Sequence, residues 1–234
     1  MNVIVFGATG MIGRGVLIEC LEDPRVRSVL AIGRRSCGLR HTKLREVIRP
    51  DLFDYRDATD DLQEYDACFF CLGVSATGMS EAAYRRVTYD LTIAAASALA
   101  GLNPRLTFCY FSGQGTDSTE RGRLMWARVK GATENRLLEV FPMSAYMFRP
   151  GFIQPLKGAR SSVRLYRLFY LVTAPLFPVL RRLFPRYVTT TVNVGQAMIR
   201  VAADGYSKPI LETHDINWLV ADKSTRDTCH RHLG

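Results

Sequence analysis

The chain lacks several features that would place it in other classes of protein. It has no uninterrupted apolar run of about 20 residues, the length that a membrane-spanning helix needs. No basic leader precedes the first apolar run, so we expect no signal peptide and a cytoplasmic location. Internal repeats and low-complexity linkers are also missing. With 234 residues, 47% of them hydrophobic and 23% charged, the chain is predicted to form one globular domain over residues 1–234.

Lysine is scarce, because only five of the 31 basic residues are lysines. The formal net charge of +9 therefore comes almost wholly from arginine. A basic balance can indicate nucleic acid, anionic lipid or small anionic ligands. The arginines are scattered along the chain, and no nucleic-acid recognition module accompanies them. We therefore expect no nucleic-acid partner and attribute the charge to solubility and to a phosphate-bearing ligand.

The cysteines do not form a metal-binding pattern. Cys68 and Cys71 have the spacing of a chelating pair, but they lie in an apolar run, 67–72, that is typical of a buried strand. Residues three apart in a strand point to opposite faces, so this pair is not expected to chelate one ion. The tail Cys229-His230-Arg231-His232 is interpreted as a solvated end. We expect core thiols and no metal site.

A glycine-spaced turn near the start is the most informative feature that is present. An apolar run, 3–6, leads into Gly-Ala-Thr-Gly-Met-Ile-Gly at 7–13, and apolar residues at helical spacing follow. Here Gly7 permits a tight reversal, Gly10 lets the backbone approach phosphates, and Gly13 lets the helix pack on its strand. Free N–H groups and the dipole at the helix start favour an anion. The turn therefore predicts the pyrophosphate site of a dinucleotide, lined also by Thr9, Met11 and Ile12.

Apolar runs and helical segments alternate along the chain. The strand candidates are 2–6, 26–32, 43–48, 66–72, 105–111 and 144–149. The clearest helical segments are 11–22, 80–100 and 123–140. Such alternation predicts right-handed crossovers and a parallel sheet covered on both faces. We predict an α/β fold, a doubly wound parallel sheet of the Rossmann type with a small irregular C-terminal region on the substrate side.

The residues that follow the second strand indicate which dinucleotide binds. In a doubly wound sheet, ligands lie outside the carboxyl ends of the strands. Enzymes that use NAD usually place a carboxylate after this strand, whereas the chain has Gly33-Arg34-Arg35 there, and we expect no Asp or Glu nearby. Guanidinium groups can hold a 2′-phosphate bidentately and with full charge. The pattern favours NADP(H) over NAD(H).

Further cofactor contacts are predicted after the remaining strands. Asp51 follows the third strand and could accept a hydrogen bond from the adenine amino group, or could simply cap its own loop. Gly73 leaves room for the adenosine ribose, and the turn at 149–153 is suited to lining the nicotinamide. The complete set of cofactor residues predicted after these strands is Asp51, Leu52, Leu72, Gly73, Pro150, Gly151 and Ile153.

Several short motifs occur in one order along the chain: residues 7–13, 32–35, 70–73, 110–113, 129–134, 148–151, 192–198 and 209–212. As an ordered set they resemble the short-chain dehydrogenase/reductase superfamily in its atypical, NmrA-like division. The similarity is strongest to Tat-interacting-protein-like oxidoreductases and to proteins of the NAD-dependent epimerase/dehydratase type. It extends to about residue 212. The resemblance implies a Rossmann fold and an NAD(P)-dependent oxidoreductase or epimerase-like activity.

The resemblance also implies a catalytic set, from which this chain departs. Family enzymes use a Ser, and a Tyr placed four residues before a Lys; the Tyr transfers the proton, the Lys holds the ribose and the Ser polarises a carbonyl. Ser112 and Lys130 stand at the first and last of these positions, but Trp126 occupies the Tyr position. An indole N–H can donate a hydrogen bond but does not titrate in water. None of the five lysines has a Tyr four residues before it.

Three accounts of this departure stay open. Another tyrosine or a water could deliver the proton in an active reductase. Alternatively, the chain could bind NADP(H) without turnover, as a sensing or interaction protein. Thirdly, Lys130 and Ser112 could serve a redox step that needs no strong side-chain acid. Lys130 can hold the ribose in each account.

The C-terminal third changes character over 160–186. Apolar residues form one helical stripe there, with arginines beside it, and Pro175 and Pro178 divide it into two short helices. We expect 152–190 to be an insertion that covers the substrate pocket; peripheral membrane contact through 164–184 is the alternative. The expected partners are a small-molecule substrate of apolar character and a second copy of the chain in a homodimer.

Overall fold

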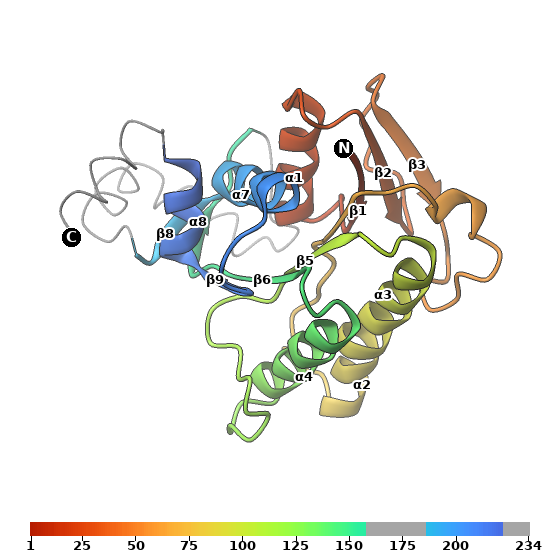
Figure 1. The fold of residues 1–234 in the computed structure, drawn as a ribbon. Helices are drawn as coiled ribbons and strands as arrows, with labels where there is room; N and C mark the ends of the chain where they lie inside the picture. Colours follow the sequence, from red (N-terminus) through yellow and green to blue (C-terminus); the bar gives the residue numbers. More distant parts are fainter. Residues whose placement is uncertain (158–185, 222–234) are drawn as a thin grey trace.

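The computed structural model describes residues 1–157 and 186–221, and its centre is a seven-stranded parallel sheet in the order β3-β2-β1-β4-β5-β6-β9 (Figure 1). The strand order reverses between β1 and β4, which makes the sheet doubly wound. The α/β Rossmann fold predicted from the sequence is thereby confirmed. Its strands are β1 (Asn2–Phe6), β2 (Ser28–Gly33), β3 (Leu44–Ile48), β4 (Ala67–Phe70), β5 (Thr107–Phe111), β6 (Ala145–Arg149) and β9 (Ile210–Glu212).

Some predictions fall outside the described residues. They are the basic stretch 164–184, most of the proposed 152–190 insertion and the tail that contains Cys229. The two ends of that insertion are described: β7 (Phe152–Gln154) pairs in parallel with β8 (Val188–Thr190) in a separate small sheet. The two described ends of this insertion therefore lie next to each other.

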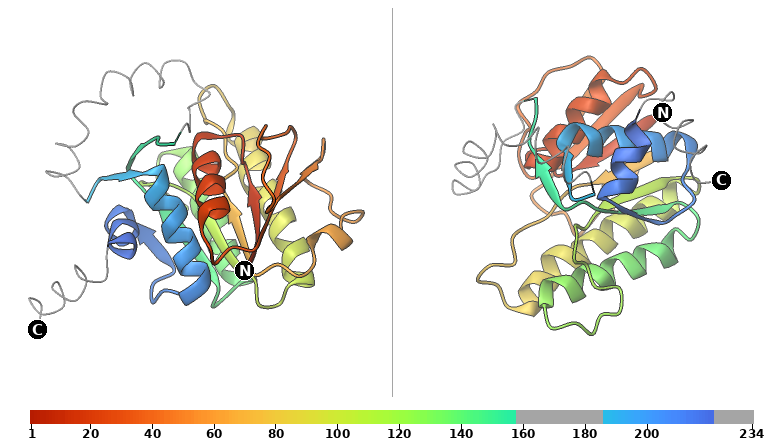
Figure 2. Two further views of the ribbon diagram at one scale, coloured as in Figure 1. Left: turned by 90° about the horizontal axis from the view of Figure 1, so that it is seen from above. Right: turned by 90° about the vertical axis from the view of Figure 1, so that its left-hand side faces the viewer.

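Helices cover both faces of the large sheet. On one face, α1 (Met11–Glu22) packs against α7 (Thr191–Asp204), and α8 (Thr213–Val220) packs against α7. The other face carries α3 (Leu91–Leu102) and α4 (Met125–Val140), which lie side by side (Figure 2). The three layers leave the carboxyl ends of the strands as the edge where a ligand can reach the sheet.

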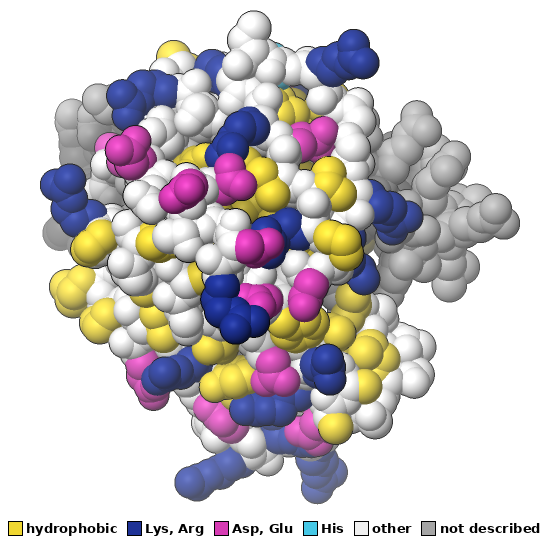
Figure 3. All heavy atoms as spheres, turned by 90° about the vertical axis from the view of Figure 1, so that its right-hand side faces the viewer, with side chains coloured by type: hydrophobic (Ala, Val, Ile, Leu, Met, Phe, Trp, Pro, Cys, Tyr) yellow, Lys and Arg dark blue, Asp and Glu magenta, His cyan; other side chains and the backbone are white. Residues whose placement is uncertain are grey.

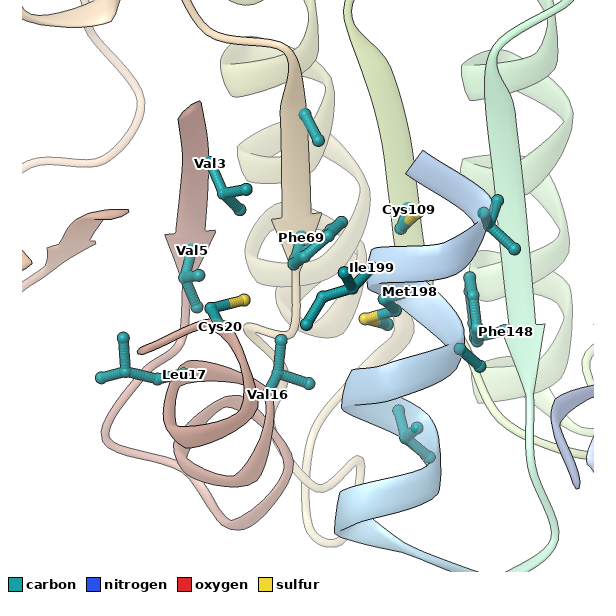
Figure 4. Packing of buried hydrophobic residues seen from close by; sticks show 14 of the residues in the cluster. Val3, Val5, Val16, Leu17, Cys20, Phe69, Cys109, Phe148, Met198 and Ile199 are labelled. Atoms are coloured by element: carbon teal, nitrogen blue, oxygen red, sulfur yellow. The ribbon is translucent and has the colours of Figure 1, made fainter. Parts of the chain in front are cut away.

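Alternating side chains build two separate cores, one on each face of the sheet. Val3 and Val5 of β1 point to one face, where they join residues of α1 and α7 (Figure 4). Ile4 and Phe6 point to the other face and join the core beneath α3 and α4. This period of two is what strand geometry dictates. The same alternation separates Cys68 from Cys71, which pack into different cores, as the sequence predicted.

The helical run predicted over 80–100 has an irregularity in its middle. It consists of α2 (Glu81–Arg85), a π-helical turn η2 (Arg86–Asp90) and α3, without a break in the backbone. A π-turn inserts one residue and rotates the helix face that follows, an effect that residue types alone did not reveal. A 3₁₀ turn, η1 (Asp60–Leu62), precedes β4.

The sheet edge at β3 carries charges of both signs. Arg45 of β3 pairs with Asp61, and Arg49 just beyond the strand pairs with Asp57. The space-filling view of this side shows basic and acidic side chains intermixed (Figure 3). Charged edge strands resist pairing with another sheet. Among the described helices, none is both long and apolar enough to cross a membrane.

Candidate functional site

The glycine turn between β1 and α1 is built as its spacing predicts. Gly7 has φ +80°, and a Cβ there would lie 2.7 Å from the backbone of Cys71 and Leu72. A Cβ on Gly13 would lie 2.1 Å from the carbonyl oxygen of Gly7. Both positions therefore require glycine, the first for its backbone conformation and the second for the close approach of α1 to its strand.

Gly10 leaves the start of α1 open. Its own N–H donates to the Gly7 carbonyl at 2.9 Å, no side chain caps the helix, and a Cβ at Gly10 would meet only the Gly7 oxygen, at 3.4 Å. The first N–H groups of α1 are thus free to bind an anion. A cavity of about 570 Å³, here named the glycine-turn cavity, lies against this turn. Its lining includes the predicted residues Gly7, Thr9, Gly10, Arg34, Arg35, Leu72 and Gly73.

Arg34 and Arg35 lie exposed at the wall of this cavity. Among the described residues, neither guanidinium group has a hydrogen-bond or ion-pair partner. The expectation that no carboxylate lies near them needs correction, because Glu46 of β3 also lines the cavity. Glu46 is distant in sequence but adjacent in space, since β3 pairs with β2. Its carboxylate binds Ser36 and Cys37 rather than either arginine.

The two residues predicted after β3 lie apart from the other cofactor residues. The Asp51 carboxylate accepts a hydrogen bond from the Phe53 N–H at 2.8 Å, which is the loop-capping interaction that the sequence left as its alternative. Leu52 is buried in the core beneath α3. Neither residue lines the glycine-turn cavity. A contact from Asp51 to an adenine stays a prediction.

A second cavity, of about 450 Å³, is lined by Met11 and Ile12 of the first turn of α1. We name it the Lys130 cavity. It brings together residues from α1, α4 and the ends of β5 and β6, namely Met11, Ile12, Phe111, Ser112, Gly113, Gln114, Trp126, Lys130, Pro150, Gly151 and Ile153. The predicted nicotinamide-side residues are therefore neighbours in space.

The Lys130 ammonium group is fixed at the base of this cavity. It donates a hydrogen bond to the backbone carbonyl of Ser112. Burial lowers the pKa of Lys130 to about 8, and the negative charge of Glu134 partly opposes this shift. Glu134 is itself buried and accepts hydrogen bonds from Arg149, which links α4 to the end of β6. Lys130 thus lies on a rigid support.

Ser112 does not present its hydroxyl to the cavity. Its side chain is fully buried, and Oγ donates to the Phe148 carbonyl at 3.2 Å. The expectation that Ser112 polarises a substrate carbonyl is not supported by this geometry, because its one O–H donor is used within the protein. Gln114, two residues further along the chain, also lines the cavity, and it was not predicted from the sequence. Its position shortly after the end of β5 could have indicated a place at the site.

Trp126 lies where the Lys130 cavity meets a third, outer cavity of about 640 Å³. The indole ring packs over Gly115, whose hypothetical Cβ would lie 3.1 Å from the ring. Among the described residues the indole N–H has no hydrogen-bond partner. The outer cavity is lined by Val74, Ser75, Ala76, Thr77, Tyr84, Arg123, Leu124, Met125, Trp126 and Lys130. Tyr84 is thus a tyrosine outside α4 that shares a cavity with Trp126 and Lys130.

Comparisons with known proteins show which of them share sequence or fold with this chain. No model of a known protein family matches the chain. A curated relative, leucinostatins biosynthesis cluster protein T of Purpureocillium lilacinum, is 27% identical over 143 residues. That match covers 60% of this chain and spans about half, 52%, of the relative.

Solved structures share the fold across nearly the whole chain. An oxidoreductase of the short-chain dehydrogenase/reductase family from Burkholderia thailandensis superposes with a TM-score of 0.67 at 17% identity, covering 98% of this chain and 96% of that one. The WbmF enzyme of Bordetella bronchiseptica, in complex with NAD+ and UDP, gives 0.65 at 16% identity, covering 91% and 71%. UDP-N-acetylglucosamine 4-epimerase of Methanobrevibacter ruminantium gives 0.61 at 16% identity, covering 88% and 74%. The chain thus has the Rossmann-type fold of these enzymes.

Proposed function

We propose that the chain is an NADP(H)-binding protein of the atypical, NmrA-like short-chain dehydrogenase/reductase type. One observation carries the proposal. Residues predicted from separate sequence motifs line two cavities, one against the glycine turn and one against the first turn of α1, at the carboxyl edge of the sheet. Open amide groups at that turn suit a pyrophosphate, and the two cavities suit the two halves of a dinucleotide.

The preference for NADP(H) over NAD(H) rests on Arg34 and Arg35. Two guanidinium groups beside the cavity, with no hydrogen-bond or ion-pair partner in the described part of the chain, suit a 2′-phosphate. WbmF has been solved with NAD+ and with NADH, so the proposed preference differs from the cofactor in that neighbour. The carboxylate of Glu46 is engaged by Ser36 and Cys37 of the loop after β2, and it therefore does not cancel the arginines as a phosphate site.

Chemistry at the nicotinamide end is proposed to be weak or altered. A bound nicotinamide would supply hydride transfer; Lys130 would hold the adjoining ribose hydroxyls. The Trp126 N–H could donate a hydrogen bond to a substrate oxygen, but it could not supply a proton at neutral pH. The outer cavity, with Leu124 59% exposed and Val74 42% exposed, suits a substrate of apolar character.

A second function, sensing of NADP(H) without turnover, is favoured by the burial of the Ser112 hydroxyl together with Trp126. In that case the same cavities would bind the cofactor, and a change in the protein's surface or assembly would be the output. The two functions share the binding site and differ only in catalysis.

Calorimetric titration with NADPH and NADH tests the binding proposal. We expect NADPH to bind more tightly than NADH, and the Arg34→Ala, Arg35→Ala double variant to lose that preference. Arg105→Ala is the matched control, because this exposed arginine lies just before β5, at the amino ends of the strands. Equal affinity for both nucleotides in the wild type, unchanged in the double variant, would refute the phosphate site.

A further inference from the structure

The loop that carries the arginines is fixed at Cys37 from two sides. The Glu46 Oε1 atom accepts a hydrogen bond from the Cys37 N–H at 2.7 Å. Arg14 of α1 donates from its guanidinium group to the Cys37 carbonyl. The loop is thus attached to the edge strand β3 through its N–H and to α1 through its carbonyl oxygen.

The second carboxylate oxygen of Glu46 extends this attachment. Oε2 accepts from the Ser36 hydroxyl at 2.8 Å, and the Ser36 Oγ in turn accepts from the Gly38 N–H at 3.0 Å. Gly38 has φ +67°, so the chain turns sharply there. We name the hydrogen-bonded group of Arg14, Ser36, Cys37 and Glu46 the Cys37 clamp.

Glu46 is itself rigidly placed. It lies in the middle of β3 and pairs with Ala31 of β2. Ala31 is two positions before Gly33, where β2 ends. Burial raises its pKa, but hydrogen bonds from Cys37 and Ser36 outweigh this effect, and the net result is a pKa below the ordinary value. The carboxylate is therefore ionised at neutral pH, and its bonds are charge-assisted.

Arg34 and Arg35 immediately precede the clamp, and within residues 1–157 and 186–221 their guanidinium groups make no hydrogen bond or ion pair. Their backbone is held at one end by β2, which ends at Gly33, and at the other by the clamp. A loop fixed in this way loses less conformational freedom when its side chains close on a ligand. The clamp therefore limits the positions that the two arginines can take.

We propose that Glu46 is a positioning residue that sets the preference for the phosphorylated dinucleotide by fixing the Arg34–Arg35 loop from β3. The proposal rests on the proposed function, since it concerns the 2′-phosphate end of the same site. Glu46 itself does not contact the phosphate. Its influence should therefore be confined to NADPH and absent for NADH, which lacks the 2′-phosphate.

Binding of NADPH and NADH to Glu46→Ala, Glu46→Gln and wild type tests this assignment. Because Glu46→Ala removes two charge-assisted hydrogen bonds, it should weaken the affinity for NADPH roughly tenfold. The affinity for NADH should change less than about twofold. Glu46→Gln should stay close to wild type, because the amide oxygen can accept from Cys37 and the amide N–H₂ can donate to Ser36. Arg45→Ala is the matched control: it alters the adjacent residue of β3 and its bridge to Asp61 without touching the clamp.

Each outcome decides the assignment. A selective loss of NADPH in Glu46→Ala with recovery in Glu46→Gln supports it. In Glu46→Ala, equal weakening of the binding of both nucleotides, or no change in either affinity, would overturn it. Tighter NADPH binding in Glu46→Gln would also overturn it, because repulsion between the Glu46 charge and the phosphate would then dominate. If Glu46→Ala fails to fold, the Glu46→Gln titration still distinguishes positioning from repulsion. A wild type that binds neither nucleotide would refute the proposed function instead.

Discussion

The glycine-turn cavity and the Lys130 cavity lie at one edge of the same sheet, yet their polar groups are used differently. In the first, the N–H groups at the start of α1 have no side-chain cap, and the two arginines have no hydrogen-bond or ion-pair partner among the residues that the structure describes. In the second, the Ser112 hydroxyl and the Lys130 ammonium group are bonded to the protein's own backbone. The groups proposed for binding are thus open to a ligand, whereas the groups proposed for chemistry are bonded within the protein. If the proposed function holds, binding and turnover should be separable by mutation.

The largest effect is expected from closing the glycine turn. Gly13→Ala would place a methyl group 2.1 Å from the Gly7 oxygen, so the turn must open or α1 must move away from β1. We expect affinity for both nucleotides to fall beyond detection by calorimetry, with a lower melting temperature. Gly101→Ala serves as the control, since nothing lies within 4 Å of its Cβ position. Retained binding in Gly13→Ala would place the pyrophosphate elsewhere.

Removing the two arginines should affect one nucleotide only. Each charge-assisted contact to a phosphate contributes about 1.5 kcal/mol or more, so the Arg34→Ala, Arg35→Ala variant should bind NADPH roughly a hundredfold more weakly. NADH affinity should stay within about twofold of wild type, because its ribose carries no 2′-phosphate. The ratio of the two dissociation constants, measured at two salt concentrations, checks this.

Restoring a titratable group tests the chemical end of the site. Trp126→Tyr is expected to raise NADPH oxidation against a panel of apolar aldehydes and ketones roughly tenfold or more, the contribution of a positioned acid. Trp126→Phe, which restores no hydroxyl, is the control. Turnover in wild type as fast as in Trp126→Tyr would show that another group, such as Tyr84, already supplies the proton.

The prediction that bears least on nucleotide binding concerns the pH dependence of stability. Because the pKa of Lys130 is about 8 in the folded chain and about 10.5 when unfolded, the unfolded state binds more protons between these values. The contribution of Lys130 to the free energy of unfolding should therefore rise as pH increases from 8 to 10.5, by up to about 3 kcal/mol. Urea titrations at several pH values give the free energy of unfolding of wild type and of Lys130→Met, and the difference between the two measures this contribution. A constant difference across this window would mean an unshifted lysine.

Much of this arrangement could be predicted from the sequence, because it depends on local patterns. The period of apolar residues located six strands, and the bounds of α1, at Met11–Glu22, match the prediction. Gly7 and Gly13 could be interpreted from spacing because their constraint lies within one strand–turn–helix unit. The short strand β9, with three residues, carries too little periodicity to be recognised.

What the sequence did not reveal depends on contacts between distant segments. The burial of the Ser112 hydroxyl follows from its bond to Phe148, 36 residues away on the neighbouring strand. The place of Glu46 in the arginine loop follows from the register that sets it opposite Ala31. Neither pairing has a local signature, because strand order and register are properties of the assembled sheet.

The contact between Trp126 and Gly115 also constrains the order in which the site could change by mutation. Any side chain at Gly115 would meet the indole at 3.1 Å, and φ of +85° adds strain for most residues. Substitution at position 115 is therefore opposed twice, because the indole would have to move by a few tenths of an ångström and the backbone conformation would stay strained. A smaller residue at position 126 would remove only the first obstacle, so the glycine at 115 is expected to outlast a change at 126.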